Sequence, residues 1–131
     1  MSIEVNWYGD TKGEVYWKFQ GKWNWEEYAE AQRASSALIS SVDHTVNIIG
    51  NLEKSPSLPP NAITVYRAHS SSSEPNTGVI VLVGATTFVR TMTRLFLQLL
   101  PKEVTGTHFM FAKTDKEALT LIAPVQESVV S

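Results

Sequence analysis

The strongest constraint on the fold is a strand-then-helix pattern in residues 78–101, GVIVLVGATTFVRTMTRLFLQLLP. Residues 79–83 are apolar, mostly β-branched and bounded by glycines, which predicts a strand buried on both faces inside a sheet. Thr86 or Thr87 can cap the helix that follows. Pro101 stops this helix, and its apolar residues recur at helical spacing: Phe88, Met92, Leu95, Phe96 and Leu99. Such a stripe predicts an amphipathic helix packed on the sheet, the second part of a βαβ unit.

The N-terminal third predicts a hairpin followed by a helix. Apolar residues alternate with polar or aromatic ones in residues 3–8 and 15–20, on either side of a Gly-rich turn. Asn24 and Glu27 have the spacing of a capping box, and Trp23 and Tyr28 that of a hydrophobic staple. The apolar stripe of this helix is expected at Tyr28, Ala31, Ser35, Leu38 and Val42.

Further strands and helices are expected downstream. Residues 45–52 predict a third strand, and the proline-rich residues 53–60 a loop. A short helix can begin at Pro60, where a missing amide proton costs nothing. Residues 108–112 predict the last strand. A second capping box in residues 114–117 begins a final helix that Pro124 should close, with a frayed tail over residues 126–131.

The predicted order is β-β-α-β-(α)-β-α-β-α, an α/β fold with a five-stranded sheet and three or four helices. Strands that alternate with helices require crossover connections, which are almost always right-handed. We therefore expect a mixed, mostly parallel sheet whose first strand is antiparallel, in one domain over residues 1–125.

Composition excludes several classes of function. The 131 residues include 11 basic and 13 acidic side chains, so a net charge of −2 gives no footprint for nucleic acid. The absence of cysteine excludes thiolate chemistry and Cys-based metal sites. No signal peptide and no apolar run of membrane-spanning length is found, which predicts a cytoplasmic protein without membrane insertion.

The order of elements, with VYWKFQGKWNWEEYAEA at the strand–Gly–helix position and NIIGNLEKSPSLPPN at the next strand and loop, resembles the STAS fold of bacterial anti-sigma-factor antagonists. The tryptophan-rich form around Trp17, Trp23 and Trp25 is most similar to uncharacterised STAS-like bacterial proteins. The resemblance implies a non-enzymatic regulatory or protein-interaction domain. Its partner would be a protein such as a kinase or an anti-sigma-type regulator, and a homodimer is a further option.

In the antagonists, a serine preceded by aspartate at the start of the second helix is phosphorylated. This chain has no Asp-Ser pair there, and Ser55 and Ser57 are the candidate modification sites. Phosphate would add about −1.5 to −2 charges and could abolish a protein contact. The contact surface is expected to combine this loop with the face of the later helix that carries two arginines; its candidate residues are Glu53, Lys54, Leu58, Asn61, Arg90, Arg94 and Leu97.

No catalytic or cofactor motif stands out. A plain helix cap is the preferred explanation of Thr86 and Thr87 at this strand-to-helix junction, and they are the place to expect a small anion if one binds. His44, His69 and His108 lack the spacing of a metal site. The alternative function is a carrier of a small apolar ligand or lipid in a pocket lined by Trp17, Trp23, Trp25 and Tyr28, which core packing also explains.

Overall fold

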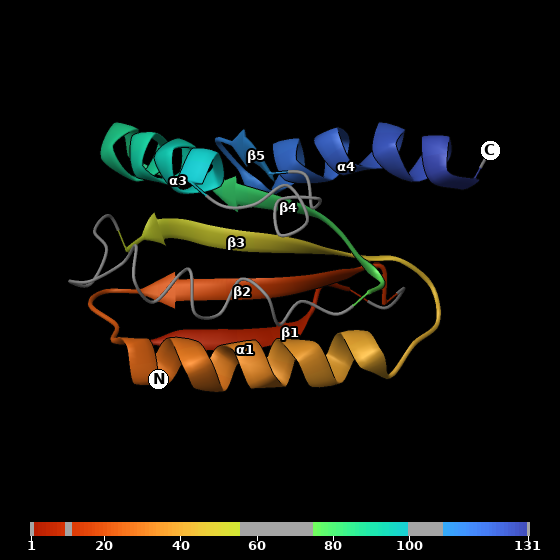
Figure 1. Cartoon of the computed structure of the whole chain (residues 1–131), viewed down its shortest axis with the longest axis horizontal. Coiled ribbons are helices and arrows are strands. Elements are labelled where there is room, and N and C mark those ends of the chain that lie inside the picture. Colours follow the sequence, from red (N-terminus) through yellow and green to blue (C-terminus); the bar gives the residue numbers. More distant parts are fainter. Residues whose placement is uncertain (1, 10–11, 56–74, 100–108, 131) are drawn as a thin grey trace.

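The computed structural model describes residues 2–9, 12–55, 75–99 and 109–130 of the chain. In this part a single mixed sheet has the order β1-β2-β3-β4-β5 (Figure 1). β1 pairs with β2 in antiparallel fashion, and the other neighbouring strands are parallel. The strands are β1 (Ile3–Trp7), β2 (Glu14–Gln20), β3 (Val46–Lys54), β4 (Thr77–Val83) and β5 (Phe109–Ala112). The expectation of a mixed, mostly parallel five-stranded sheet in an α/β fold is confirmed.

The described helices cover both faces of this sheet. They are α1 (Trp25–Ser40), α3 (Thr87–Leu99) and α4 (Asp115–Val130). α1 packs on β1 and β2, whereas α4 packs on β3, β4 and β5 (Figure 1). Crossovers of one hand between parallel strands in sequential order put their helices on the same face. Consistent with this, Ile39 of α1 and Val89 of α3 belong to one core cluster, and α4 covers a second cluster.

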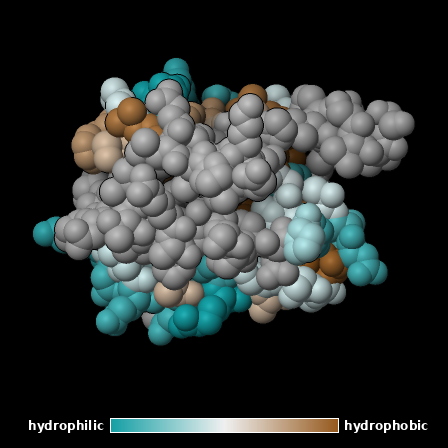
Figure 2. Space-filling view, in the orientation of Figure 1, coloured by the Kyte–Doolittle hydropathy of each residue, from teal (hydrophilic) through white to brown (hydrophobic). Residues whose placement is uncertain are grey.

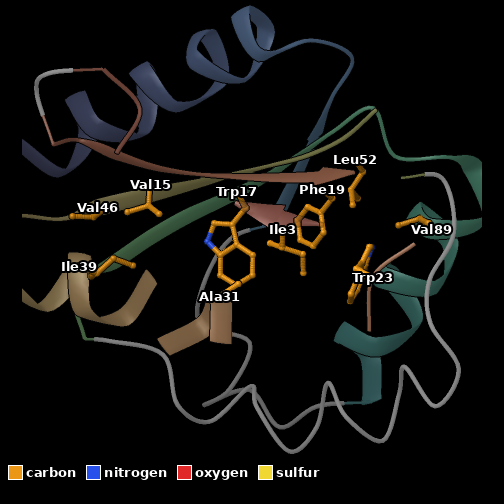
Figure 3. Close-up of a cluster of buried hydrophobic side chains, with 10 residues drawn as sticks. All are labelled: Ile3, Val15, Trp17, Phe19, Trp23, Ala31, Ile39, Val46, Leu52 and Val89. Atoms are coloured by element: carbon orange, nitrogen blue, oxygen red, sulfur yellow. The ribbon is translucent and has the colours of Figure 1, made fainter. Parts of the chain in front are cut away.

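The core under α1 is rich in aromatic side chains from β2 and the start of α1 (Figure 3). Trp17, Phe19 and Trp23 are buried. The Trp17 indole donates to Ser35 Oγ at 3.1 Å, and the Trp23 indole to Ser55 Oγ at 2.9 Å. These bonds allow tryptophan to be buried, because an indole N–H without an acceptor would lose its hydration uncompensated.

The core under α4 centres on β4. Val79, Val81 and Val83 are almost fully buried, and the intervening Ile80 and Leu82 are half-buried. β4 lies between β3 and β5, so its predicted interior place is confirmed. The two faces of β4 are not equally covered. The face with Val79, Val81 and Val83 lies under α4 and is more completely shielded than the face with Ile80 and Leu82.

Helix α1 begins as its sequence predicts. The Asn24 side chain accepts from the Glu27 backbone N–H at 2.8 Å, and the rings of Trp23 and Tyr28 stack with centroids 5.9 Å apart. Only this half of the capping box forms, since Glu27 Oε2 has no hydrogen-bond partner. Ala31 and Ser35 face the core as expected, and Ile39 joins them although the predicted stripe omitted it.

Two element ends differ from the predictions. β3 continues through Glu53 to Lys54, into the expected loop, because its pairing with β2 extends to Lys54. α4 continues past Pro124 to Val130, so residues 126–130 are helical and not a frayed tail. A proline withdraws one amide from the helical ladder, and the bonds on either side can carry the helix past it. Within the described ranges, none of the helices combines the length and the apolar character required to cross a bilayer.

Candidate functional site

The carboxyl ends of β4 and β5 form the most distinctive polar edge of the described sheet. Gly84 follows β4 with φ of 70°, and its N–H donates to the Ala112 carbonyl at 3.0 Å. A Cβ at Gly84 would collide with Glu53 of β3, including its backbone. Glycine is therefore required twice here, for the left-handed backbone and for the close approach of two strands.

Both following helices begin at this edge. Thr86 Oγ1 accepts from the Val89 N–H at 3.2 Å, which confirms Thr86 as the cap of α3 and leaves Thr87 as its first residue. Thr114 Oγ1 accepts from the Glu117 N–H at 3.1 Å and caps α4 in the same way. Two helix N-termini, each with partial positive charge, thus lie beside one another.

A cavity of about 310 Å³ lies between these helix starts. Its lining combines Arg90 and Lys113 with Phe111 and with Glu117, so two cations face one carboxylate. Neither cation forms a hydrogen bond or ion pair through its side chain within the described part of the chain. The predicted anion residues Thr86 and Thr87 do not line this cavity, and the backbone just before them does, at residues 84–85.

Arg90 and Arg94, predicted as a pair, have different surroundings. Arg90 is half-buried in the cavity wall, whereas the exposed Arg94 guanidinium lies 5.3 Å from the centroid of the Phe111 ring. A cation over an aromatic face at this distance is a cation–π contact. Phe111 therefore joins the two arginines into one surface that runs from the cavity onto α3.

The outward face of α3 is apolar, contrary to the expected stripe. Phe88 is 62% exposed and Leu95 46% exposed, while Val89, at 3%, enters the core; the side chains of Phe96 and Leu99, also expected in the stripe, lie outside the described part. Met92 is half-buried. Val89 lies about 100° around the helix from Phe88, at the margin of the expected stripe, and packing beside Trp23 and Leu52 brings it to the core (Figure 3). Hydrophobic atoms are visible over α3 in the upper left of Figure 2.

The loop candidates divide into three groups. Ser55 is 1% exposed; its Oγ accepts from the Trp23 indole and donates to the Gly21 carbonyl at 2.7 Å. This hydroxyl is a structural element, which disfavours its modification in the folded state. Glu53 and Lys54 are exposed at the end of β3. Ser57, Leu58 and Asn61 lie outside the described residues, as does the side chain of Leu97.

Sequence analysis missed a polar network beside this edge. The Tyr16 hydroxyl donates to Asp115 Oδ2 and the Asn51 amide donates to Asp115 Oδ1, each at 2.9 Å. Burial and the bond to Asp115 raise the pKa of Tyr16 to about 12. The phenol therefore stays protonated at neutral pH and acts as a donor that holds the first turn of α4 on β2 and β3. No local pattern could reveal it, because the partners lie 99 residues apart.

The remaining candidates have structural surroundings. His44 Nε2 lies 2.8 Å from the Lys12 carbonyl oxygen, and no three His, Asp or Glu side chains gather as a metal site among the residues described. His69 and His108 lie outside them. Trp17, Trp23, Trp25 and Tyr28 are in ring-to-ring contact with centroids 5.1–5.9 Å apart. These four rings pack on one another as part of the core. Core packing was one of the two interpretations that the sequence allowed, and a pocket for an apolar ligand was the other.

Comparison with known proteins gives no match, either to a protein-family model or to a curated protein sequence.

Proposed function

We propose that the chain is a cytoplasmic, non-enzymatic protein-interaction domain of the STAS-like type, and that it contacts its partner through the outer face of α3. The observation that carries the proposal is the exposure of Phe88 and Leu95 beside Arg94. Support for the family comes from the order of elements and from the mixed sheet with an antiparallel first strand. The sequence predicted a contact surface that combines this helix, through Arg90, Arg94 and Leu97, with the loop that follows Glu53.

The two exposed residues form one surface. Phe88 and Leu95 are seven positions apart, which is two helical turns, so their side chains project from the same side of α3. Among the side chains that the structure describes, which exclude those of residues 93, 96–99, 109 and 123–130, Phe88 and Leu95 are the large hydrophobic ones that are exposed. Apolar side chains grouped with arginine are typical of protein interfaces.

The chemistry of this surface indicates the partner. Arg94 neighbours Leu95 on α3, and Arg90 and Lys113 line the adjoining cavity, where Glu117 is the one carboxylate among the described lining residues. A complementary partner presents apolar side chains with carboxylates around them, since opposite charges steer association and fix its orientation. Around the cavity, the described side chains include no hydrogen-bonded nucleophile and base, the minimal arrangement of covalent catalysis.

The test compares capture of partner proteins by three immobilised forms: the wild type, F88S/L95S and the control K116S, which changes an exposed residue of α4. A true partner is retained by the wild type and K116S and lost with F88S/L95S, and its purified form should bind with the same ranking. Circular dichroism and melting curves establish that the variants are folded. Equal recovery by all three forms refutes the α3 surface. A small apolar molecule that co-purifies with all three forms and is seen by native mass spectrometry supports the carrier alternative instead.

A further inference from the structure

β1 is an edge strand with a groove beside it. It pairs with β2 on one side, and in the sheet order no described strand pairs with its other side. A cavity of about 340 Å³ runs along four consecutive residues of β1, from Ile3 to Asn6, and along one side of α1. Because successive strand residues point to opposite faces, contact with all four of them means that the groove follows the backbone edge of the strand.

The ladder determines which backbone groups of β1 face this groove. Ser2 accepts from the Gln20 N–H and Tyr8 donates to the Glu14 carbonyl, both at 2.8 Å. In an antiparallel pair, residues that bond to the partner strand alternate with residues that point away from it. Even-numbered residues therefore bond to β2, and the N–H and C=O groups of Ile3 and Val5 point to the open edge. These are the groups that a further strand would pair with.

The groove is acidic. Glu4 lines it from β1, and Glu27 and Glu30 line it from α1, while no lysine or arginine of the described part of the chain lines it. None of these three carboxylates forms an ion pair or side-chain hydrogen bond within the described part of the chain, and Glu27 Oε2 is shielded from solvent without a donor. A carboxylate oxygen in that position is stabilised by any donor brought alongside it.

We infer that the groove between β1 and α1 binds an extended, basic segment of a partner protein, which adds as a sixth strand to the edge of the sheet. Main-chain hydrogen bonds to Ile3 and Val5 would supply affinity, as is usual when a strand adds to the edge of a sheet. Lysine or arginine at alternate positions would face Glu27 and Glu30. The small side chains of Ala31 and Ala34 on the same side of α1 leave room for the long stems of such residues.

A second copy of this chain fits the groove poorly. Pairing β1 with β1 would bring Glu4, Glu27 and Glu30 of one copy close to the same carboxylates of the other. Like charges opposed across a strand pair are destabilising. The charge of the lining therefore favours a cationic strand over self-association. This inference does not depend on the α3 surface proposed above.

The probe is a short synthetic peptide that alternates valine with lysine or arginine, with a control peptide that carries glutamate in place of each basic residue. We expect the basic peptide to shift the backbone amide NMR signals of Ile3 and Val5, and the acidic peptide to leave them unchanged. E27Q/E30Q should weaken binding about tenfold, since each removed charge pair contributes a few-fold. E26Q changes an exposed glutamate of α1 outside the groove lining and should bind as the wild type does.

Val5→Pro tests the backbone pairing directly. It removes one outward-pointing N–H, and proline is tolerated on edge strands where that N–H faces away from the ladder. Loss of one hydrogen bond should weaken binding about fivefold. Should V5P fail to fold, the glutamine variants and the NMR map decide the question alone. Equal affinity for both peptides, unchanged affinity in E27Q/E30Q, or signal changes confined to the cavity at Arg90 would overturn the inference. F88S/L95S should bind the basic peptide as the wild type does. A failure of the groove inference would therefore leave the α3 proposal untouched.

Discussion

Replacement of Ser55 separates a structural hydroxyl from a regulatory one. The side chain is 1% exposed, accepts from the Trp23 indole and donates to the Gly21 carbonyl. Ser55→Ala removes two hydrogen bonds of about 1 kcal/mol each and leaves a buried indole N–H unsatisfied, a total of about 2–3 kcal/mol. Urea unfolding followed by tryptophan fluorescence should show this as a lower midpoint with an unchanged slope.

Ser55→Asp is the more severe case. A carboxylate there would be buried against the Gly21 carbonyl oxygen, and among the described residues its donor would be the Trp23 indole; the cost is at least about 3–5 kcal/mol. Since small domains are stable by about 5–15 kcal/mol, S55D should be strongly destabilised instead of mimicking a folded phosphorylated state. The control is Ser40→Asp at the exposed end of α1, which should cost no more than about 1 kcal/mol, because a negative charge in the last turn of a helix is only mildly unfavourable. A folded S55D with wild-type stability would refute the reasoning and restore Ser55 as a switch.

Three further predictions test the site and the core. Gly84→Ala should cost about 1 kcal/mol of left-handed backbone strain plus a collision with the Glu53 backbone. Gly9→Ala, at φ of 77° with open space around it, should cost the strain alone. Equal losses of stability in urea unfolding would contradict the close approach of the strands. Asn24→Ala should lower the unfolding free energy by about 1 kcal/mol, and no change would show that the α1 cap is dispensable. Burial raises the pKa of Tyr28 to about 12, so the stabilising contribution of the protonated phenol is complete below pH 10 and is lost as the pH rises through 12. Between pH 9 and pH 11, Tyr28→Phe should therefore lose less stability than the wild type. Equal losses in the two proteins would contradict this.

Local sequence patterns predicted most of the sheet. Alternation in residues 3–8 and 15–20 defines a hairpin because one face of each strand must be buried, and the short β-branched run of β4 defines an interior strand for the same reason. Caps at Asn24, Thr86 and Thr114 were readable because a cap depends on residues three positions apart.

The side of α3 that meets the core was not readable. Phe88, Met92 and Leu95 share one side of α3, which spacing alone would turn to the core, whereas Val89 lies about 100° further around the helix and is the buried residue. The shape of the core around Trp23 decides which side packs. The contact between Tyr16 and Asp115 was equally hidden, because it depends on how β2 and α4 are placed in space. Both omissions concern tertiary placement, which a periodicity does not contain.

The net charge of −2 hides a segregation of charge that the fold creates. The acidic groove lies between β1 and α1, and the cationic cavity lies at the carboxyl ends of β4 and β5. These two strands lie on the opposite side of the sheet from β1 (Figure 1). The electrostatic fields of opposite charges that neighbour each other on one surface would cancel at a distance. Salt limits the reach of a charge to about 10 Å at ordinary ionic strength, so charges at separate places on the protein each act on the partner that approaches there. The two surfaces should therefore select partners of opposite charge and bind them independently. A soluble polyanion should compete for the α3 surface and leave unchanged the NMR signals of Ile3 and Val5 in the free protein.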